Sequence, residues 1–164
     1  LLRDGARVGD ALYVSGTLGD AAGALAFLRG EWQPEADAAE YLLNRFNRPR
    51  ARIDLGRELL GQASAAIDIS DGLLADAGHI ADASGVRLVI EPSLLPLSPA
   101  LSSYRSHEQV IRWALAGGDD YELCFTLPED ELAPQGCTRI GHVEAGEGVD
   151  CGLAIDIPGG YQHF

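Results

Sequence analysis

The sequence predicts an α/β (α+β) sandwich in which helices pack on one sheet. Segments with helical spacing alternate with short β-prone runs along the whole chain, which is typical of a sheet covered by helices. Glycine and proline residues separate most of these segments. With 164 residues, 46% of them apolar, the chain is long enough to bury one core, so we expect a single domain over residues 1–164.

The first third is expected to contain one strand and three helices. A β-prone run at residues 11–16 is followed by a Gly-containing turn and an Ala/Leu-rich helix that ends near Gly30. Apolar spacing predicts a helix over residues 35–46, which Pro49 ends. Another helix is expected over residues 53–60.

The middle third is expected to contain a buried strand, a helix and a second strand. Residues 65–69 form an apolar run that leads directly into Ser70-Asp71-Gly72. The following apolar residues fall on one helical face, and Gly85 is placed to end that helix. Alternating β-branched residues predict a strand over residues 86–91, and a proline-rich connection follows it.

The last third begins with a helix whose start has a recognisable signal. Ser106 and Gln109 fit a capping box, and Gly117-Gly118 ends the helix. The remaining expected elements are strands over residues 121–126, 137–143 and 153–157, and a short helix over residues 128–132 with proline in its first turn.

Charge and composition exclude several functions. The formal net charge of −13 argues against a nucleic acid or an anionic membrane as partner. A polyphosphate ligand would be repelled as well unless divalent cations bridge the charges, and Mg²⁺ is the usual bridging ion. Every basic residue is arginine, and the absence of lysine excludes a P-loop and Schiff-base chemistry.

The chain is expected to be a soluble, cytoplasmic piece of a longer protein. Three cysteines without C-x-x-C spacing suggest neither a disulfide framework nor a zinc site, and reduced thiols fit the cytosol. No apolar run approaches the roughly 18 to 20 residues that cross a bilayer. Because the chain begins at Leu1 and has no methionine, we expect further sequence to precede it.

The strongest local signal for function is Asp68-Ile69-Ser70-Asp71-Gly72. Asp68 interrupts an expected buried strand, where an ionised carboxylate is costly unless it is paired or metal-bound. Strand periodicity puts Asp68 and Ser70 on one face, and Asp71 follows at the helix start. Ligands bind at such strand ends in open α/β sheets. The alternative is that Ser70 or Asp71 only caps the helix and Asp68 pairs with an arginine, but a cap leaves Asp68 unexplained.

A second polar cluster, Gly117-Gly-Asp-Asp-Tyr-Glu122, follows the next-to-last helix. Paired glycines allow a ligand to approach the backbone, and adjacent acids lead into a strand. Taken alone, the cluster is better explained by a helix end followed by a solvated acidic turn.

These two clusters, together with residues 9–20 (GDALYVSGTLGD) and residues 160–164 (GYQHF), resemble the C-terminal half of the thiamine-monophosphate kinase family. The resemblance covers essentially the whole chain. More distant relatives in the same superfamily are aminoimidazole ribonucleotide synthetase, selenophosphate synthetase and the hydrogenase-maturation dehydratase. The resemblance implies a mixed, largely antiparallel sheet with helices packed on it, and a two-domain, ATP-using architecture.

The resemblance implies transfer of the γ-phosphoryl group of ATP to thiamine monophosphate, which yields thiamine diphosphate and ADP. Clustered carboxylates that hold Mg²⁺ suit this reaction, because it needs positioning and charge neutralisation more than a covalent nucleophile. No Ser-His-Asp or Cys-His pairing is evident, and His79 is expected on a helix surface. By resemblance, Asp68 and Asp71 match magnesium ligands, Arg3 and Ser70 match ATP contacts, and Asp119 and Tyr161 match substrate contacts.

Two of these assignments have a specific qualification. Asp119 stands where many relatives have glutamate, so its reach is shorter. Tyr161 could stack on the cationic thiazolium, or could instead anchor the end of the chain to the core.

The resemblance also implies an N-terminal half before Leu1 that holds most of the nucleotide, several magnesium ligands and a homodimer interface. We therefore expect this chain to be inactive, or nearly so, by itself. Two alternatives stay open: another ATP-using synthetase of the superfamily, or a non-catalytic nucleotide-binding domain.

Overall fold

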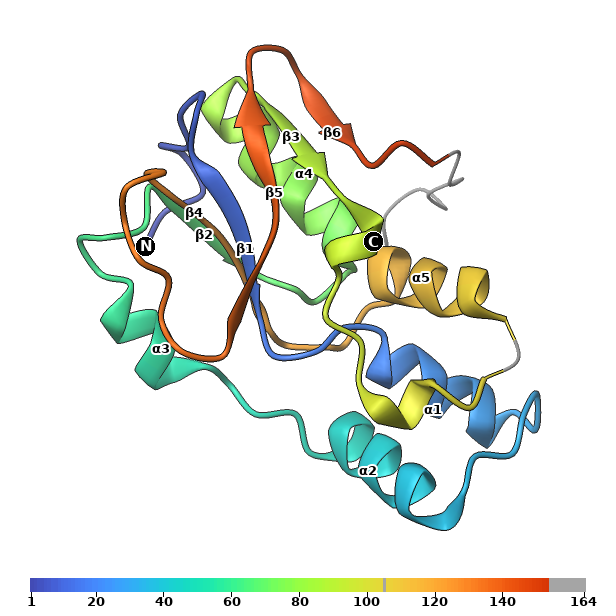
Figure 1. Ribbon diagram of the computed structural model, residues 1–164. Coiled ribbons are helices and arrows are strands. Elements are labelled where there is room, and N and C mark those ends of the chain that lie inside the picture. The colour runs from blue at the N-terminus through green and yellow to red at the C-terminus, as the bar shows by residue number, and fades with distance from the viewer. Residues whose placement is uncertain (105, 154–164) are drawn as a thin grey trace, which may run out of the picture.

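The computed structural model describes residues 1–104 and 106–153. Within these ranges the chain forms one sheet, a set of α-helices and two short 3-10 helices (Figure 1). The elements are, in order, β1 (Ala11–Ser15), α1 (Asp20–Leu28), α2 (Ala36–Asn47), α3 (Ile53–Glu58), β2 (Ala65–Asp68), α4 (Leu73–Ser84), β3 (Arg87–Ile90), η1 (Pro92–Leu94), η2 (Pro99–Leu101), α5 (His107–Ala116), β4 (Leu123–Leu127), β5 (Cys137–Glu144) and β6 (Gly148–Asp150).

The sheet is mixed and largely antiparallel, as the family resemblance implied. Its strand order is β2-β4-β1-β5-β3-β6. Every neighbouring pair is antiparallel except β3 and β6, which run parallel. An irregularity between Leu12 and Tyr13 shifts the register of β1 against β5. The predicted fold class is therefore confirmed.

The main core lies between one face of the sheet and α4 (Figure 1). The apolar side of α4 fits the helical spacing of its sequence, and Gly85 ends the helix in the left-handed conformation with φ 65°. Residues of α5 join the same core. Its fully buried aliphatic members include Leu12, Val14, Leu18, Ile69, Leu73, Ile80, Leu88, Ile90, Leu115 and Ile140.

A smaller apolar cluster occupies the opposite face, beside α3. Leu59 and Phe125 are fully buried there. The Tyr13 ring stacks on Phe125 with a centroid distance of 5.6 Å. This cluster anchors α3 and the chain that leads into β2.

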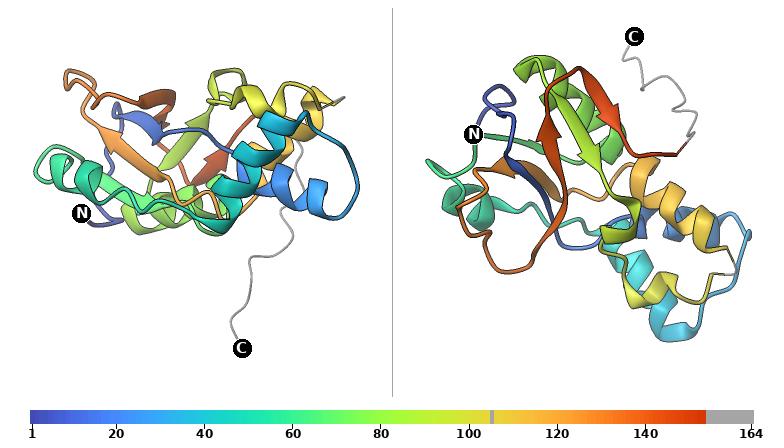
Figure 2. Two further views of the ribbon diagram at one scale, coloured as in Figure 1. Left: turned by 90° about the horizontal axis from the view of Figure 1, so that it is seen from below. Right: turned by 45° about the horizontal axis from the view of Figure 1, so that its top comes forward.

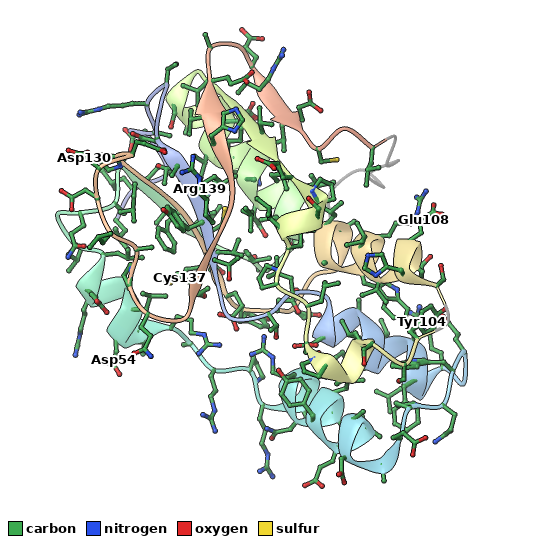
Figure 3. All side chains as sticks on the ribbon, viewed as in Figure 1. Asp54, Tyr104, Glu108, Asp130, Cys137 and Arg139 are labelled. Carbon is green, nitrogen blue, oxygen red and sulfur yellow. The ribbon has the colours of Figure 1, made fainter. Side chains whose placement is uncertain are left out.

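Helices α1, α2 and α5 and the 3-10 helix η2 form a helical lobe at one end of the sheet (Figure 2). Three aromatic rings, Trp32, Tyr104 and Trp113, pack against one another in it, with centroid distances from 4.5 to 6.2 Å. Tyr104, on the loop before α5, is labelled in Figure 3. The capping prediction for α5 is confirmed, because Ser106 Oγ accepts a hydrogen bond from the Gln109 amide at 3.2 Å.

Two predicted elements differ from the structure. Residues 128–132 form a turn instead of a helix, and Leu132 is 88% exposed, so this segment has no apolar face to bury. Figure 3 places Asp130 on that loop between β4 and β5. The strand expected over residues 153–157 has only Leu153 within the described residues, where it lies in a bend, and residues 154–157 lie outside them. The three-residue strand β6 was not predicted.

The three cysteines are free thiols, as expected. Burial raises the pKa of Cys124 to about 12 and that of Cys137 to about 11. None of the helices described is long and apolar enough to span a lipid bilayer.

Candidate functional site

The polar segment that follows β2 lies against the segment that follows α5, close to where the sheet meets the helical lobe (Figure 1). The Asp119 amide donates to the Ser70 carbonyl and the Tyr121 amide to the Ile69 carbonyl, both at 2.9 Å. The Ile69 amide donates to the Glu122 carbonyl at 2.8 Å. These bonds continue the antiparallel pairing of β2 and β4, so the two polar clusters of the sequence form one site.

The paired glycines allow this close approach. A Cβ atom on Gly118 would lie 2.5 Å from the Ser70 carbonyl oxygen. On Gly117 it would lie 2.4 Å from the Trp113 carbonyl oxygen and 2.8 Å from the Ala22 Cβ. The groups that closely approach these glycines are therefore the protein's own backbone and the Ala22 side chain, and the expected approach of a ligand to them stays a prediction.

Asp68 and Asp71 are both exposed, which corrects the expectation that Asp68 lies within a buried strand. Asp68 is the last residue of β2, an edge strand, and the sheet no longer covers it there. Neither Ser70 nor Asp71 caps α4, because the helix begins at Leu73 and Gly72, with φ 112°, is its N-cap. In residues 1–104 and 106–153 the carboxylates of Asp68 and Asp71 make no hydrogen bond and no ion pair. Neither helix capping nor pairing with an arginine therefore explains these two acids within the described residues.

Asp76 lies beneath this segment, and the sequence analysis did not single it out. It belongs to the first turn of α4, and only 2% of it is exposed. Its Oδ2 accepts hydrogen bonds from the amides of Ser70 at 2.9 Å and Asp71 at 3.0 Å. Burial raises the pKa of Asp76 above its usual range despite these two donors, and the charges of Asp71 and Asp68 raise it further.

Asp119 and Tyr121 have left-handed backbones, with φ of 65° and 51°. Such conformations are unfavourable for residues other than glycine, and strained residues cluster at functional sites. The Tyr121 hydroxyl donates to Asp119 Oδ1 at 3.2 Å. The charge of Asp119 is the main cause of the raised pKa of Tyr121, and Asp68 and Asp71 contribute. The charges of the three acidic residues predicted for the site therefore all act on one phenol, and Asp119 also contacts it.

Arg3 lies near the Asp68 end of the site. The Leu2 carbonyl accepts from the Ala66 amide at 2.8 Å, so the start of the chain runs beside β2. Arg3 and Asp68 both line an open hollow of about 500 Å³. No hydrogen bond joins Arg3 to Ser70 among the residues described. Tyr161, the second predicted substrate contact, lies outside them.

Asp120 points into the protein although it follows Asp119 directly. It is 2% exposed and accepts hydrogen bonds from the Gly19 amide at 2.8 Å and the Ala21 amide at 3.4 Å, at the start of α1. Burial raises the pKa of Asp120 to about 7, against the opposing effects of these amides and of Arg45. Asp120 therefore links the candidate site to the helical lobe.

Glu122 is fully buried and paired with two arginines. Its carboxylate accepts from Arg45 Nη2 at 3.0 Å, from Arg52 Nε at 2.7 Å and from Ser15 Oγ at 2.5 Å. A desolvated charge with this many partners is satisfied. Of the acids in the second polar cluster, only Asp119 is exposed to receive a ligand.

The exposed carboxylates suit a magnesium ion carried by a nucleotide. No group of three or more His, Cys, Asp or Glu side chains in the described ranges could by itself hold a metal ion. Asp68 and Asp71 offer hard oxygen ligands, and Mg²⁺ in phosphate-binding sites commonly takes one or two carboxylates, with water and phosphate oxygens completing its coordination. The residues present therefore fit Mg²⁺.

The model of the family "AIR synthase related protein, C-terminal domain" matches residues 7–153, which is most of the chain. The chain belongs to this family. This AIR synthase related domain is similar to curated proteins named thiamine-monophosphate kinase. It is 52% identical to the one from Escherichia coli (strain K12) over 130 residues, which cover 79% of the chain and 40% of that protein. It is 44% identical to the one from Aquifex aeolicus (strain VF5) over 165 residues, covering 99% of the chain and 54% of that protein.

A solved structure of AaThiL complexed with AMPPCP and TMP has the same fold as this AIR synthase related domain. The TM-score is 0.86 at 43% identity, and the match covers 99% of the chain and 53% of that structure. The resemblance drawn from the four sequence motifs is thereby confirmed. The chain spans about half the length of the proteins that it matches.

Proposed function

We propose that the protein containing this chain is a thiamine-monophosphate kinase and that the chain is its C-terminal half. The reaction would transfer the γ-phosphoryl group of ATP to thiamine monophosphate and yield thiamine diphosphate and ADP. The names of the similar proteins support this, as does the AaThiL structure complexed with AMPPCP and TMP. The observation that carries the proposal is the convergence of the Ser70 and Asp119 segments into one site.

Each predicted site residue has a role in this proposal. Asp68 and Asp71 would hold Mg²⁺, which supplies neutralisation of phosphate charge when bound. Ser70 and Arg3 would contact ATP, and a planar guanidinium suits phosphate oxygens. Asp119 and Tyr161 would contact thiamine monophosphate. No residue needs to act as a covalent nucleophile, because the acceptor is the substrate phosphate itself.

The rest of the active site would lie on a preceding N-terminal half. This fits the 40% and 54% of the similar proteins that the chain covers. We expect the full-length protein to be a homodimer in the cytoplasm, where free cysteine thiols persist. The chain alone would have little or no activity.

The test is formation of thiamine diphosphate by the full-length protein. Asp71→Asn should lower the rate by at least about 100-fold, because loss of a ligand charge weakens the neutralisation on which phosphoryl transfer depends. Asp82→Asn is the matched control, since Asp82 is an exposed acid on α4 and its loss should leave the rate unchanged.

Three outcomes would contradict parts of the proposal. Near-normal turnover by Asp71→Asn would refute the role of Asp71. Release of ADP that does not depend on thiamine monophosphate would instead favour another ATP-using synthetase of the superfamily, and binding of ATP without ADP release would favour a non-catalytic domain.

A further inference from the structure

A buried carboxylate supports the proposed ATP and magnesium segment from behind. Asp76 is almost entirely buried, and a single oxygen, Oδ2, accepts both the Ser70 and the Asp71 amide. These are the two consecutive residues whose side chains are assigned to ATP and Mg²⁺. The carboxylate therefore contacts the backbone of the site and not its exposed surface.

The two hydrogen bonds fix the path of a short connection. Strand β2 ends at Asp68 and α4 begins at Leu73, so the residues between them belong to neither element. One edge of this connection is held by the bond between the Ser70 carbonyl and the Asp119 amide. The Ser70 and Asp71 amides form the other edge, and Asp76 is their acceptor. The directions of the Ser70 and Asp71 side chains depend on both edges.

Burying a carboxylate at position 76 costs electrostatic free energy, and the packing of α4 does not by itself require an acidic residue there. Its neighbours Leu73, Leu74, Ala77 and Ile80 are buried apolar residues of the same helix. A carboxylate placed among them is desolvated, and it contacts the backbone of a segment that also carries the Asp68 and Asp71 carboxylates. A cation bound by Asp68 and Asp71 would offset this accumulation of negative charge.

We propose that Asp76 is a positioning residue for magnesium and ATP: it holds the Ser70 and Asp71 amides so that the two side chains present their oxygens to the ligand. This inference rests on the proposed function. Groups that orient metal ligands from behind commonly change affinity or activity by about 10- to 100-fold when they are removed. A purely structural Asp76 would change stability alone.

Two substitutions in the full-length protein separate these roles. Asp76→Ala removes the acceptor, whereas Asp76→Asn can place its one carbonyl oxygen where Oδ2 lies and keep both hydrogen bonds without the charge. Asp82→Asn controls for loss of an exposed charge on the same helix.

The first readout is the magnesium concentration that gives half-maximal thiamine diphosphate formation, together with KM for ATP. Asp76→Ala should raise both by about 10- to 100-fold. Excess Mg²⁺ should restore much of kcat, and KM for thiamine monophosphate should change much less. Asp76→Asn should recover part of the loss. Unchanged magnesium dependence in Asp76→Ala would overturn the proposal.

The second readout does not need turnover. Binding of Mn²⁺ in the presence of ATP, followed by water proton relaxation, should weaken in Asp76→Ala by a similar factor. The Ser70 and Asp71 amides should exchange with solvent faster while α4 stays protected. Faster exchange with unchanged Mn²⁺ affinity would leave Asp76 a structural role only and overturn the proposal.

The outcomes distinguish this inference from the proposed function. If the wild-type protein formed no thiamine diphosphate, the proposed function would fail, and Mn²⁺ binding with ATP would still decide the role of Asp76. If Asp76→Ala did not fold, Asp76→Ser, whose hydroxyl is too short to take the place of Oδ2 under both amides, would decide: weaker Mn²⁺ binding supports the inference, and wild-type affinity in that variant overturns it.

Discussion

The buried carboxyl of Asp120 makes the stability of the domain depend on pH in an unusual direction. Its pKa is about 7 in the folded chain and 3.8 without the protein environment. The folded state therefore holds this proton more tightly than the unfolded state. The resulting stabilisation is fully present below pH 3.8 and is lost as the pH rises through about 7.

The size of the effect follows from the two pKa values. Their difference corresponds to about 4 kcal/mol in total, at about 1.4 kcal/mol for each pKa unit. Between pH 5 and pH 8 the contribution of Asp120 to the free energy of unfolding should fall by about 2 to 3 kcal/mol. Water that enters the site on ionisation would reduce this value, so it is an upper estimate.

Asp120→Asn removes the titration and keeps the shape of the side chain. Its carbonyl oxygen can still accept from the Gly19 amide, although the weaker bond to Ala21 is lost. The assay is urea denaturation of the chain at several pH values, with the wild type and the variant compared at each. The wild type should lose about 2 to 3 kcal/mol relative to Asp120→Asn between pH 5 and pH 8.

The control is Asp119→Asn, which removes the same charge from the exposed neighbour and leaves the buried carboxyl in place. It should lose stability with pH as the wild type does. If Asp120→Asn and the wild type had parallel pH profiles, Asp120 would not be a desolvated acid at the start of α1, and the description of this junction would be wrong.

Three further predictions concern the structure around the site, each measured by urea denaturation. Glu122→Ala should destabilise the chain by about 3 to 5 kcal/mol, because it removes the buried carboxylate that Arg45 and Arg52 share. Glu129→Ala at an exposed pair should change stability by less than about 1 kcal/mol, and equal effects would contradict the burial argument. Gly118→Ala should cost about 1 to 3 kcal/mol, because its Cβ meets the Ser70 carbonyl, and a neutral result would mean that the two segments are not in contact. Ser106→Ala should cost about 1 kcal/mol through loss of the α5 cap, and an unchanged stability would refute the cap.

Local patterns predicted most of the fold. The alternation of helices and strands, the cap at Ser106 and the stop at Gly85 are all encoded within a few residues, and the structure confirms them. Strand β6 depends on pairing with β3, about 60 residues earlier in the chain, and three residues carry no pattern of their own. At residues 128–132 a helix was predicted that does not form, because helix-forming residue types do not make a helix without an apolar face to pack.

The sequence located the site but not the directions of its side chains. Asp119 and Asp120 are adjacent acids, and the left-handed backbone at Asp119 sends one outward and the other into the core. The predicted strand begins only at residue 121, so strand alternation assigned no direction to either side chain. The burial of Asp76 and Glu122 could not be predicted, because the groups that pair with them meet them only in the folded chain. Arg45, for example, is 77 positions from Glu122. An acidic residue on the apolar side of a predicted helix was the one available signal for Asp76.

The most direct test of the whole account is to locate Mn²⁺ on the full-length protein in the presence of ATP by paramagnetic broadening of the amide resonances of this chain. If the two polar segments form one cation-dependent phosphate site, the amides around Asp68, Asp71 and Asp119 should broaden together, and those around the exposed acids Asp37 and Glu40 on α2 should stay sharp. Broadening at α2, or at only one of the two segments, would contradict a shared site.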